Sequence, residues 1–92
     1  MKQVSSENFN VYNQVKEPVQ VVARFVGADI RPLIFTWGRR NYSVQKINLV
    51  HSAREGRALV HYFSVSDAAN YFKLKYNTQT SQWWLEESYA SN

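Results

Sequence analysis

The sequence contains no cysteine, and this absence excludes several kinds of site at once. Without thiols the chain has no disulfide framework, no thiolate nucleophile and no cysteine ligands for zinc. The two histidines, His51 and His61, are too few to hold a zinc ion, which needs three or four ligands, and few acids stand near them. We therefore expect no metal and no other cofactor.

The sequence also lacks a long apolar run. No stretch approaches the roughly 20 apolar residues that a helix needs to span a bilayer. Polar residues interrupt the segment after Met1, where a signal peptide would be apolar. We expect a protein that has no membrane contact and is, by default, cytoplasmic.

The sequence patterns that mark catalytic sites are missing as well. There is no glycine-rich phosphate loop, no pair of carboxylates on a plausible core face, and no serine with histidine and aspartate partners visible in the sequence. We therefore expect a non-enzymatic protein.

Positive charge is concentrated in the middle of the chain. The 92 residues carry a formal charge of +4. Between Arg24 and Lys75, nine Lys or Arg residues stand against three Asp or Glu residues, a local balance of 9 − 3 = +6. A basic middle favours polyanions or acidic protein surfaces as partners.

Residues 33–51 have the pattern of a β-hairpin. Large apolar side chains recur at every second position in both halves, which is typical of half-buried strands. We expect Trp37 to lie opposite Tyr42, and Phe35 opposite Val44, all on one buried face.

This register leaves residues 38–41 as a four-residue loop. A two-residue turn at Arg39–Arg40 would require positive φ at both arginines, so we expect the longer loop. After Val44 the large apolar residues move from even to odd positions. This shift predicts a β-bulge near Gln45 and Lys46 that bends the sheet.

A second hairpin is predicted over residues 47–65. A three-residue loop, Arg54–Gly56, with Gly56 in the left-handed conformation would join its strands. The expected cross-strand pairs are Ile47/Phe63, Leu49/His61 and His51/Leu59.

The strand predicted at residues 71–76 has the cleanest alternation in the chain, with lysines on one face and apolar residues on the other. A polar turn precedes it and a polar connection follows it. The expected cross-strand pairs are Val65/Phe72, Leu74/Leu85 and Tyr76/Trp83.

The predicted fold is a small all-β domain of six antiparallel strands, five of them in an uninterrupted meander. Closure would remove exposed edges, so we expect a strongly bent sheet or a small barrel of the Src-homology-3-like or OB type. A two-layer roll is the alternative. Residues 1–17 would be a mobile or docking N-terminal arm, residues 18–87 the domain, and residues 88–92 a tail.

The order of the strand and turn motifs resembles an uncharacterised family of small bacterial domains, roughly from Pro18 to Glu87. The family is found alone or attached to relatives of translesion DNA polymerases. The resemblance implies an accessory role near DNA and no catalytic residues. The motifs that carry it are Phe35-Thr36-Trp37-Gly38-Arg39-Arg40, Tyr42-Ser43-Val44, Tyr62-Phe63-Ser64-Val65, Phe72-Lys73-Leu74 and Trp83-Trp84-Leu85.

The registers above also predict a binding site on the outer face of the sheet. Lys75 would lie between Tyr62 and Trp84, in one row across three strands and flanked by Lys73 and Tyr71. Aromatic side chains that stack on unpaired bases, beside lysines that meet phosphates, are typical of surfaces that hold single-stranded nucleic acid. Phosphates would also meet Arg39 and Arg40.

Two other interpretations remain open. The row could be a solvent-facing ladder in which cross-strand and cation–π contacts only stabilise the sheet. Alternatively, the domain could bind a protein partner or a second copy through its outer apolar residues. These residues are Ile34, Val50, Val60, Tyr62, Tyr71 and Trp84.

Overall fold

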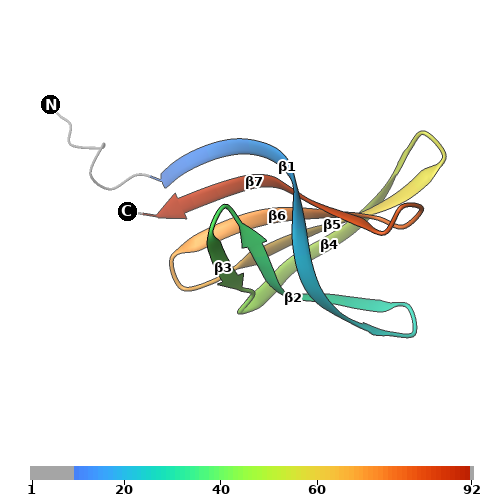
Figure 1. The fold of residues 1–92 in the computed structure, drawn as a ribbon, viewed down its shortest axis with the longest axis horizontal. Helices are drawn as coiled ribbons and strands as arrows, with labels where there is room; N and C mark the ends of the chain where they lie inside the picture. The colour runs from blue at the N-terminus through green and yellow to red at the C-terminus, as the bar shows by residue number, and fades with distance from the viewer. Residues whose placement is uncertain (1–9, 92) are drawn as a thin grey trace, which may run out of the picture.

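The computed structural model describes residues 10–91, which form one antiparallel sheet of seven strands (Figure 1). The all-β prediction is therefore confirmed. The spatial order of the strands is β3-β2-β1-β7-β6-β5-β4. The strands are β1 (Asn10–Val26), β2 (Asp29–Trp37), β3 (Arg40–Ser43), β4 (Lys46–Glu55), β5 (Ala58–Ser66), β6 (Asn70–Asn77) and β7 (Gln82–Ser91).

The predictions of six strands and of a barrel are wrong. The expected single strand from Tyr42 onward is divided into β3 and β4, which lie at opposite ends of the sheet order. At the division, the Val44 N–H donates to the Leu33 carbonyl of β2 at 2.8 Å. The next N–H, of Gln45, donates to the Ser66 carbonyl of β5 at 3.0 Å. The chain thus changes partners over two residues, and no ladder within the described residues joins β3 to β4 and closes the sheet.

Strand β1 runs along two different neighbours, so its 17 residues curve across the molecule (Figure 1). Residues 10–19 pair with β7 and residues 20–26 pair with β2. The register with β7 shifts between Gln14 and Glu17, where Lys16 has a φ of 53°. Pro18 follows this irregularity, a place where a strand tolerates proline.

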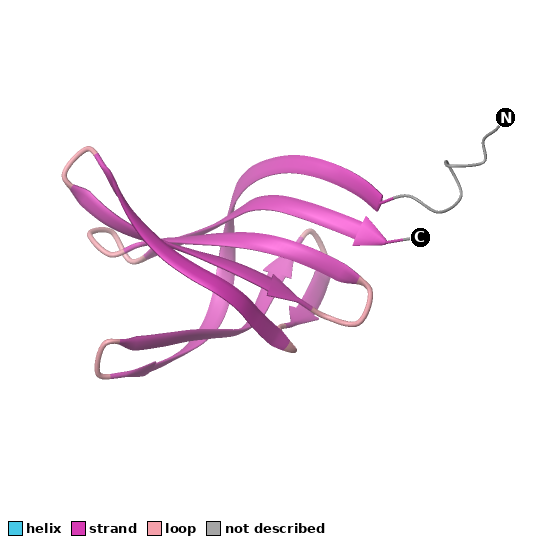
Figure 2. Ribbon diagram, turned by 180° about the vertical axis from the view of Figure 1, so that it is seen from behind, coloured by secondary structure: helices cyan, strands magenta, loops and turns pink. Residues whose placement is uncertain are grey.

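The sheet extends beyond residues 18–87 in both directions. Residues 10–17, expected to belong to an arm, form the first part of β1, and β7 continues through Ser91 into the expected tail. Figure 2 shows that strands joined by short turns make up nearly all of the described chain. The remainder of the predicted arm, residues 1–9, lies outside the described residues.

The core lies on the inner face of the bent sheet, where the β2–β3 hairpin packs against β6. The ring centroid of Phe72 is 4.9 Å from that of Phe35 and 5.1 Å from that of Tyr42. Eight of the large side chains expected to point inward are in this core or packed against it, namely Phe35, Trp37, Tyr42, Val44, Leu74, Tyr76, Trp83 and Leu85. The buried cluster consists of Val19, Phe35, Phe63, Val65, Phe72, Leu74, Tyr76, Trp83 and Leu85.

The predicted pairing of β5, β6 and β7 is confirmed: Val65 lies opposite Phe72, Leu74 opposite Leu85, and Tyr76 opposite Trp83. The register of the first hairpin is wrong by two residues, since Phe35 lies opposite Tyr42. A shift of two keeps the same side chains inward, because successive side chains alternate between the two faces.

The first hairpin turns through two residues, Gly38 and Arg39, instead of four. Gly38 has a φ of 65°, whereas Arg39 is not among the residues with positive φ. A glycine in the first central position lets a two-residue turn match the twist of its strands. The longer loop is therefore unnecessary.

The second hairpin also turns through two residues of which the first is a glycine. Its predicted register is also wrong. Gly56, with a φ of 63°, and Arg57 form a two-residue turn between β4 and β5. His51 lies opposite Tyr62 on the outer face, and the predicted pairs of this hairpin do not form. At Leu49 the observed register differs from the predicted one by an odd number of residues. Leu49 therefore points outward, and it is 60% exposed.

Candidate binding face of the sheet

The predicted row of aromatic and lysine side chains forms on the outer face. Lys75 lies opposite Tyr62 on β5 and opposite Trp84 on β7. The Lys75 Nζ is 5.6 Å from the Trp84 ring centroid, and the Lys73 Nζ is 5.9 Å from that of Tyr62. His51 stacks on Tyr62 with the ring centroids 5.0 Å apart. Sequence reasoning missed this histidine because it paired β4 in the wrong register.

A second row, of three tyrosines, crosses the same face. Tyr71 on β6 lies opposite Tyr89 on β7, and Tyr89 lies opposite Tyr12 on β1. The ring centroids of Tyr12 and Tyr89 are 6.0 Å apart. Of the three, only Tyr71 belonged to the predicted site, because residues 12 and 89 were assigned to the arm and the tail.

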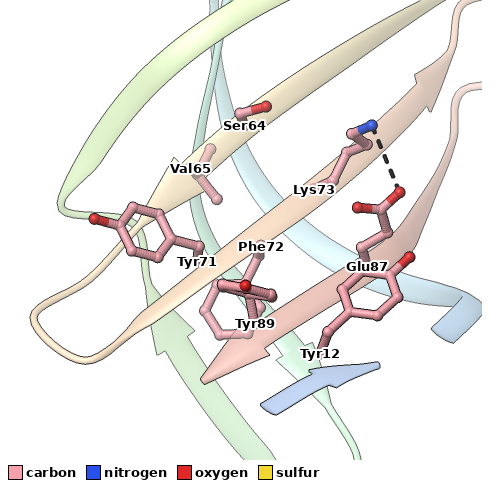
Figure 3. Close-up of a pocket in the computed structure, with 8 residues that line it drawn as sticks. All are labelled: Tyr12, Ser64, Val65, Tyr71, Phe72, Lys73, Glu87 and Tyr89. Atoms are coloured by element: carbon pink, nitrogen blue, oxygen red, sulfur yellow. Dashed lines mark ion pairs between the residues drawn. The ribbon is translucent and has the colours of Figure 1, made fainter. Parts of the chain in front are cut away.

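The tyrosine row lines an open groove of about 360 Å³ (Figure 3). Exposed fractions are 51% for Tyr12, 56% for Tyr71 and 39% for Tyr89. Lys73 and Glu87 lie beside them in the groove, with Phe72 and Val65 below. We call this the tyrosine groove.

Both lysines of the predicted site form ion pairs within the protein. The Lys73 Nζ is 3.6 Å from a carboxylate oxygen of Glu87. The Lys75 Nζ is 3.2 Å from Glu55 and 4.0 Å from Glu86, and it is only 17% exposed. A phosphate would therefore compete with these carboxylates for both lysines.

A third lysine completes the charge balance of this face. The Lys16 Nζ is 3.9 Å from the Glu86 carboxylate. Three lysines therefore stand against three glutamates, a local charge of 3 − 3 = 0. Glu86 and Glu87 come together here because the register of β7 with β6 shifts between Leu85 and Glu87. Sequence reasoning recognised no such bulge.

A hydrogen bond from the Tyr62 hydroxyl to the Glu55 carboxylate links two strands of the row. It raises the pKa of Tyr62 to about 12, because ionisation of the phenol would break it and place two negative charges together. The same bond, together with the one from Lys75, lowers the pKa of Glu55. At neutral pH the row therefore contains a neutral Tyr62 and an ionised Glu55.

The two predicted arginines do not join the row. Arg39 lies in the β2–β3 turn, and the guanidinium carbon of Arg40 is 5.9 Å from the ring centroid of Tyr42. Arg40 and Tyr42 line a separate hollow with Asp67 and Asn70 of the β5–β6 turn. The structure thus separates the expected site into an outer-face row and a distant arginine turn.

The inner face carries a serine–histidine contact that sequence reasoning missed. Ser52 lies opposite His61, and its Oγ is 2.7 Å from the His61 Nδ1. Both residues line a cleft of about 240 Å³ with Val50 and Phe63. The wrong register of the second hairpin hid this pair. No group of three or more metal-binding side chains occurs between residues 10 and 91.

Comparisons with protein-family models, curated proteins and solved structures found no match to this chain. The resemblance to a family of small bacterial domains, with its accessory role near DNA, therefore stays a prediction, as does the cytoplasmic location. The part of the chain that the structure describes has no helix long and apolar enough to cross a membrane.

Proposed function

We propose that the protein is a non-enzymatic protein-binding module that contacts its partner through the tyrosine groove. The observation that carries this proposal is the row of three exposed tyrosines from three adjacent strands. Tyrosine is enriched at protein interfaces, because its ring buries a large apolar area while its hydroxyl still finds a hydrogen-bond partner. The rigid strands beneath the rings reduce the entropy lost on binding.

The charge of this face favours a protein partner over a polyanion. Nucleic acid is attracted mainly by cations that replace the counterions of its phosphates. Lys73 and Lys75 already have carboxylate partners here, so phosphate binding would first have to break these ion pairs. A protein surface with apolar and hydrogen-bonding groups can bury the tyrosines and leave the ion pairs intact.

Site-specific crosslinking in the living cell tests this proposal. A photo-reactive phenylalanine derivative replaces Tyr71, which is 56% exposed, and in a control protein it replaces Gln79, which is exposed in the β6–β7 loop. We expect a discrete protein adduct from position 71 only. Tyr89→Ala should reduce the yield of the adduct, since tyrosine is enriched among the interface residues whose truncation costs about 2 kcal/mol or more. Adducts with nucleic acid, equal adducts from both positions, or none would refute the proposal.

Binding of single-stranded nucleic acid is a second candidate. The observation that favours it is the alignment of Tyr62 and Trp84 on either side of Lys75, since aromatic side chains beside a cation can stack on unpaired bases. The test is a titration of labelled single-stranded oligonucleotides at low and high salt, with Trp84→Ala and Lys75→Ala as variants. Base stacking contributes about 1–3 kcal/mol per aromatic side chain. Undetectable binding at low salt, or binding that neither substitution changes, eliminates this candidate.

A further inference from the structure

Strand β4 has one neighbour, β5, and its other edge is free within the described chain. It is ten residues long and contains no proline, whereas β3, the strand at the opposite end of the sheet, has four residues. Proteins usually protect edge strands by keeping them short or by placing proline in them, because unpaired backbone groups attract another strand. β4 has neither protection. Its bulge, between Ile47 and Leu49, and its charged residues Lys46, Arg54 and Glu55 lie toward its two ends, so residues 49–53 form an unprotected stretch of edge.

The hydrogen-bonding pattern identifies the backbone groups that face this edge. The Leu59 carbonyl accepts from the Thr78 N–H at 3.0 Å, so the backbone of Leu59 points away from β4. In an antiparallel pair, residues point alternately toward and away from the partner strand. Leu59 lies opposite Arg54. The N–H and C=O groups of Arg54, and by alternation those of Ser52 and Val50, therefore point to the free edge.

A cleft lies beside the same edge. The apolar residues Ala28, Ile30, Val50 and Phe63 line it together with the polar residues Asp29, Ser52 and His61. Val50 is 48% exposed although it lies opposite the buried Phe63. Figure 1 shows the β1–β2 and β4–β5 turns pointing toward the same end of the molecule. The cleft lies between these two hairpins, since residues 28–30 and residues of β4 and β5 line it. A strand added to β4 would place every second side chain over the cleft.

The charges that remain uncompensated around β4 are positive. In the ion pairs among residues 10–91, Glu55 belongs to Lys75 and Asp29 to Arg31, whereas Lys46, Arg54 and Arg57 have no acidic partner. Lys46 stands at one end of β4, and the two arginines stand at the other. A segment that pairs along this edge would gain from acidic residues at both of its ends, in either strand direction.

We infer that the free edge of β4 binds an extended segment of a partner protein by strand addition. The segment has apolar residues at alternate positions and acidic residues at both ends. Backbone hydrogen bonds to Val50, Ser52 and Arg54 hold it, and its alternate apolar side chains fill the cleft. This surface is separate from the tyrosine groove, so the inference holds or fails independently of the proposed function.

The first test uses synthetic peptides of ten residues with valine at alternate central positions and two aspartates at each end, labelled for fluorescence anisotropy. A control peptide has the same composition but adjacent valines. We expect the alternating peptide to bind and the control to bind at least tenfold more weakly. Single N-methylation should weaken binding about tenfold at amides that face β4, because it leaves buried acceptors unsatisfied. N-methylation of the intervening amides should have less than about a threefold effect.

The second test uses variants of the protein. Val50→Lys should weaken peptide binding at least tenfold, whereas Leu49→Lys, a matched control at a position that is 60% exposed on the other face, should change it less than threefold. Amide exchange should slow at Val50, Ser52 and Arg54 when the peptide binds. Lack of binding at about 1 mM peptide, or equal effects of N-methylation at all positions, overturns the inference. So does a dimer that Val50→Lys dissociates, because a second copy would then occupy the edge.

Discussion

The Tyr62 hydroxyl donates a hydrogen bond to Glu55, although the β-ladder pairs Tyr62 with His51, four residues earlier in β4. The phenol thus lies along the strand and reaches the carboxylate beside the turn. The other oxygen of that carboxylate is 3.2 Å from the Lys75 Nζ. The Glu55 carboxylate thus joins β4, β5 and β6, and its bond to the Tyr62 hydroxyl couples the pKa values of these two groups.

The first prediction concerns the titration of this group. The pKa of Tyr62 is raised to about 12, above the ordinary value of about 10. The bond therefore stabilises the fold fully below about pH 10, and this stabilisation is lost as the pH rises through about 12. In an NMR titration of the tyrosine ring carbons, we expect the native protein to show a phenol that ionises near pH 12 and Tyr62→Phe to lack it. The same substitution should raise the pKa of Glu55. Ionisation of Tyr62 near pH 10 in the native protein would contradict this.

The second prediction concerns the neutral charge of the outer face. Replacing Glu55, Glu86 and Glu87 by glutamine changes the formal charge from +4 to +7 and leaves the lysines unpaired. We expect this triple variant to bind single-stranded DNA more tightly than the native protein. Three phosphate contacts would give a slope of log K against log salt of about −2. Glu17→Gln, at an exposed position outside these ion pairs, is the control. Equal affinity of native and triple-variant proteins would refute the neutralisation argument.

The third prediction concerns the core. Phe35 is 1% exposed and Leu74 is fully buried, so truncation of either leaves a cavity. Leu74→Ala should lower the free energy of unfolding by about 2–5 kcal/mol and Phe35→Ala by about 3–5 kcal/mol. This is a large part of the stability of a small domain. Urea denaturation measures both, with Gln20→Ala as the exposed control, expected within about 0.5 kcal/mol of the native value. If either core substitution lowers the free energy of unfolding no more than Gln20→Ala does, the prediction is wrong.

The fourth prediction concerns the first hairpin turn. Gly38 has a φ of 65°, and a Cβ built there meets no atom within 4 Å. Gly38→Ala should therefore destabilise the protein by backbone strain alone, about 1–2 kcal/mol. Gly38→Asn should cost less, since asparagine tolerates this conformation better. Arg39→Ala is the matched control in the same turn. If alanine and asparagine cost the same, the strain argument fails.

Alternation in the sequence was sufficient to predict the face of most core residues. It was wrong for two residues that we expected among the outer apolar ones, since Val60 is fully buried and Val50 lies opposite the inward Phe63. Alternation also predicted the register of β5, β6 and β7, because Tyr71 to Tyr76 alternate without interruption between two polar turns. The Tyr62, Lys75 and Trp84 row followed from that register. In both hairpins the sequence interpretation missed a two-residue turn that begins with a glycine, Gly38 or Gly56. In the first hairpin the resulting shift of two residues keeps the same faces, so alternation could not exclude it, whereas in the second the odd shift changes the face of Leu49.

The sequence by itself determined that the chain is all-β and which side of its strands is apolar, because these properties depend on neighbours one or two residues apart. The tertiary structure alone decided that residues 10–17 pair with β7, that β3 and β4 separate, and that glutamates neutralise the lysines of the outer face. Each of these depends on contacts between residues distant in the chain. Such contacts exist only once the sheet has bent and its bulges have brought particular side chains together.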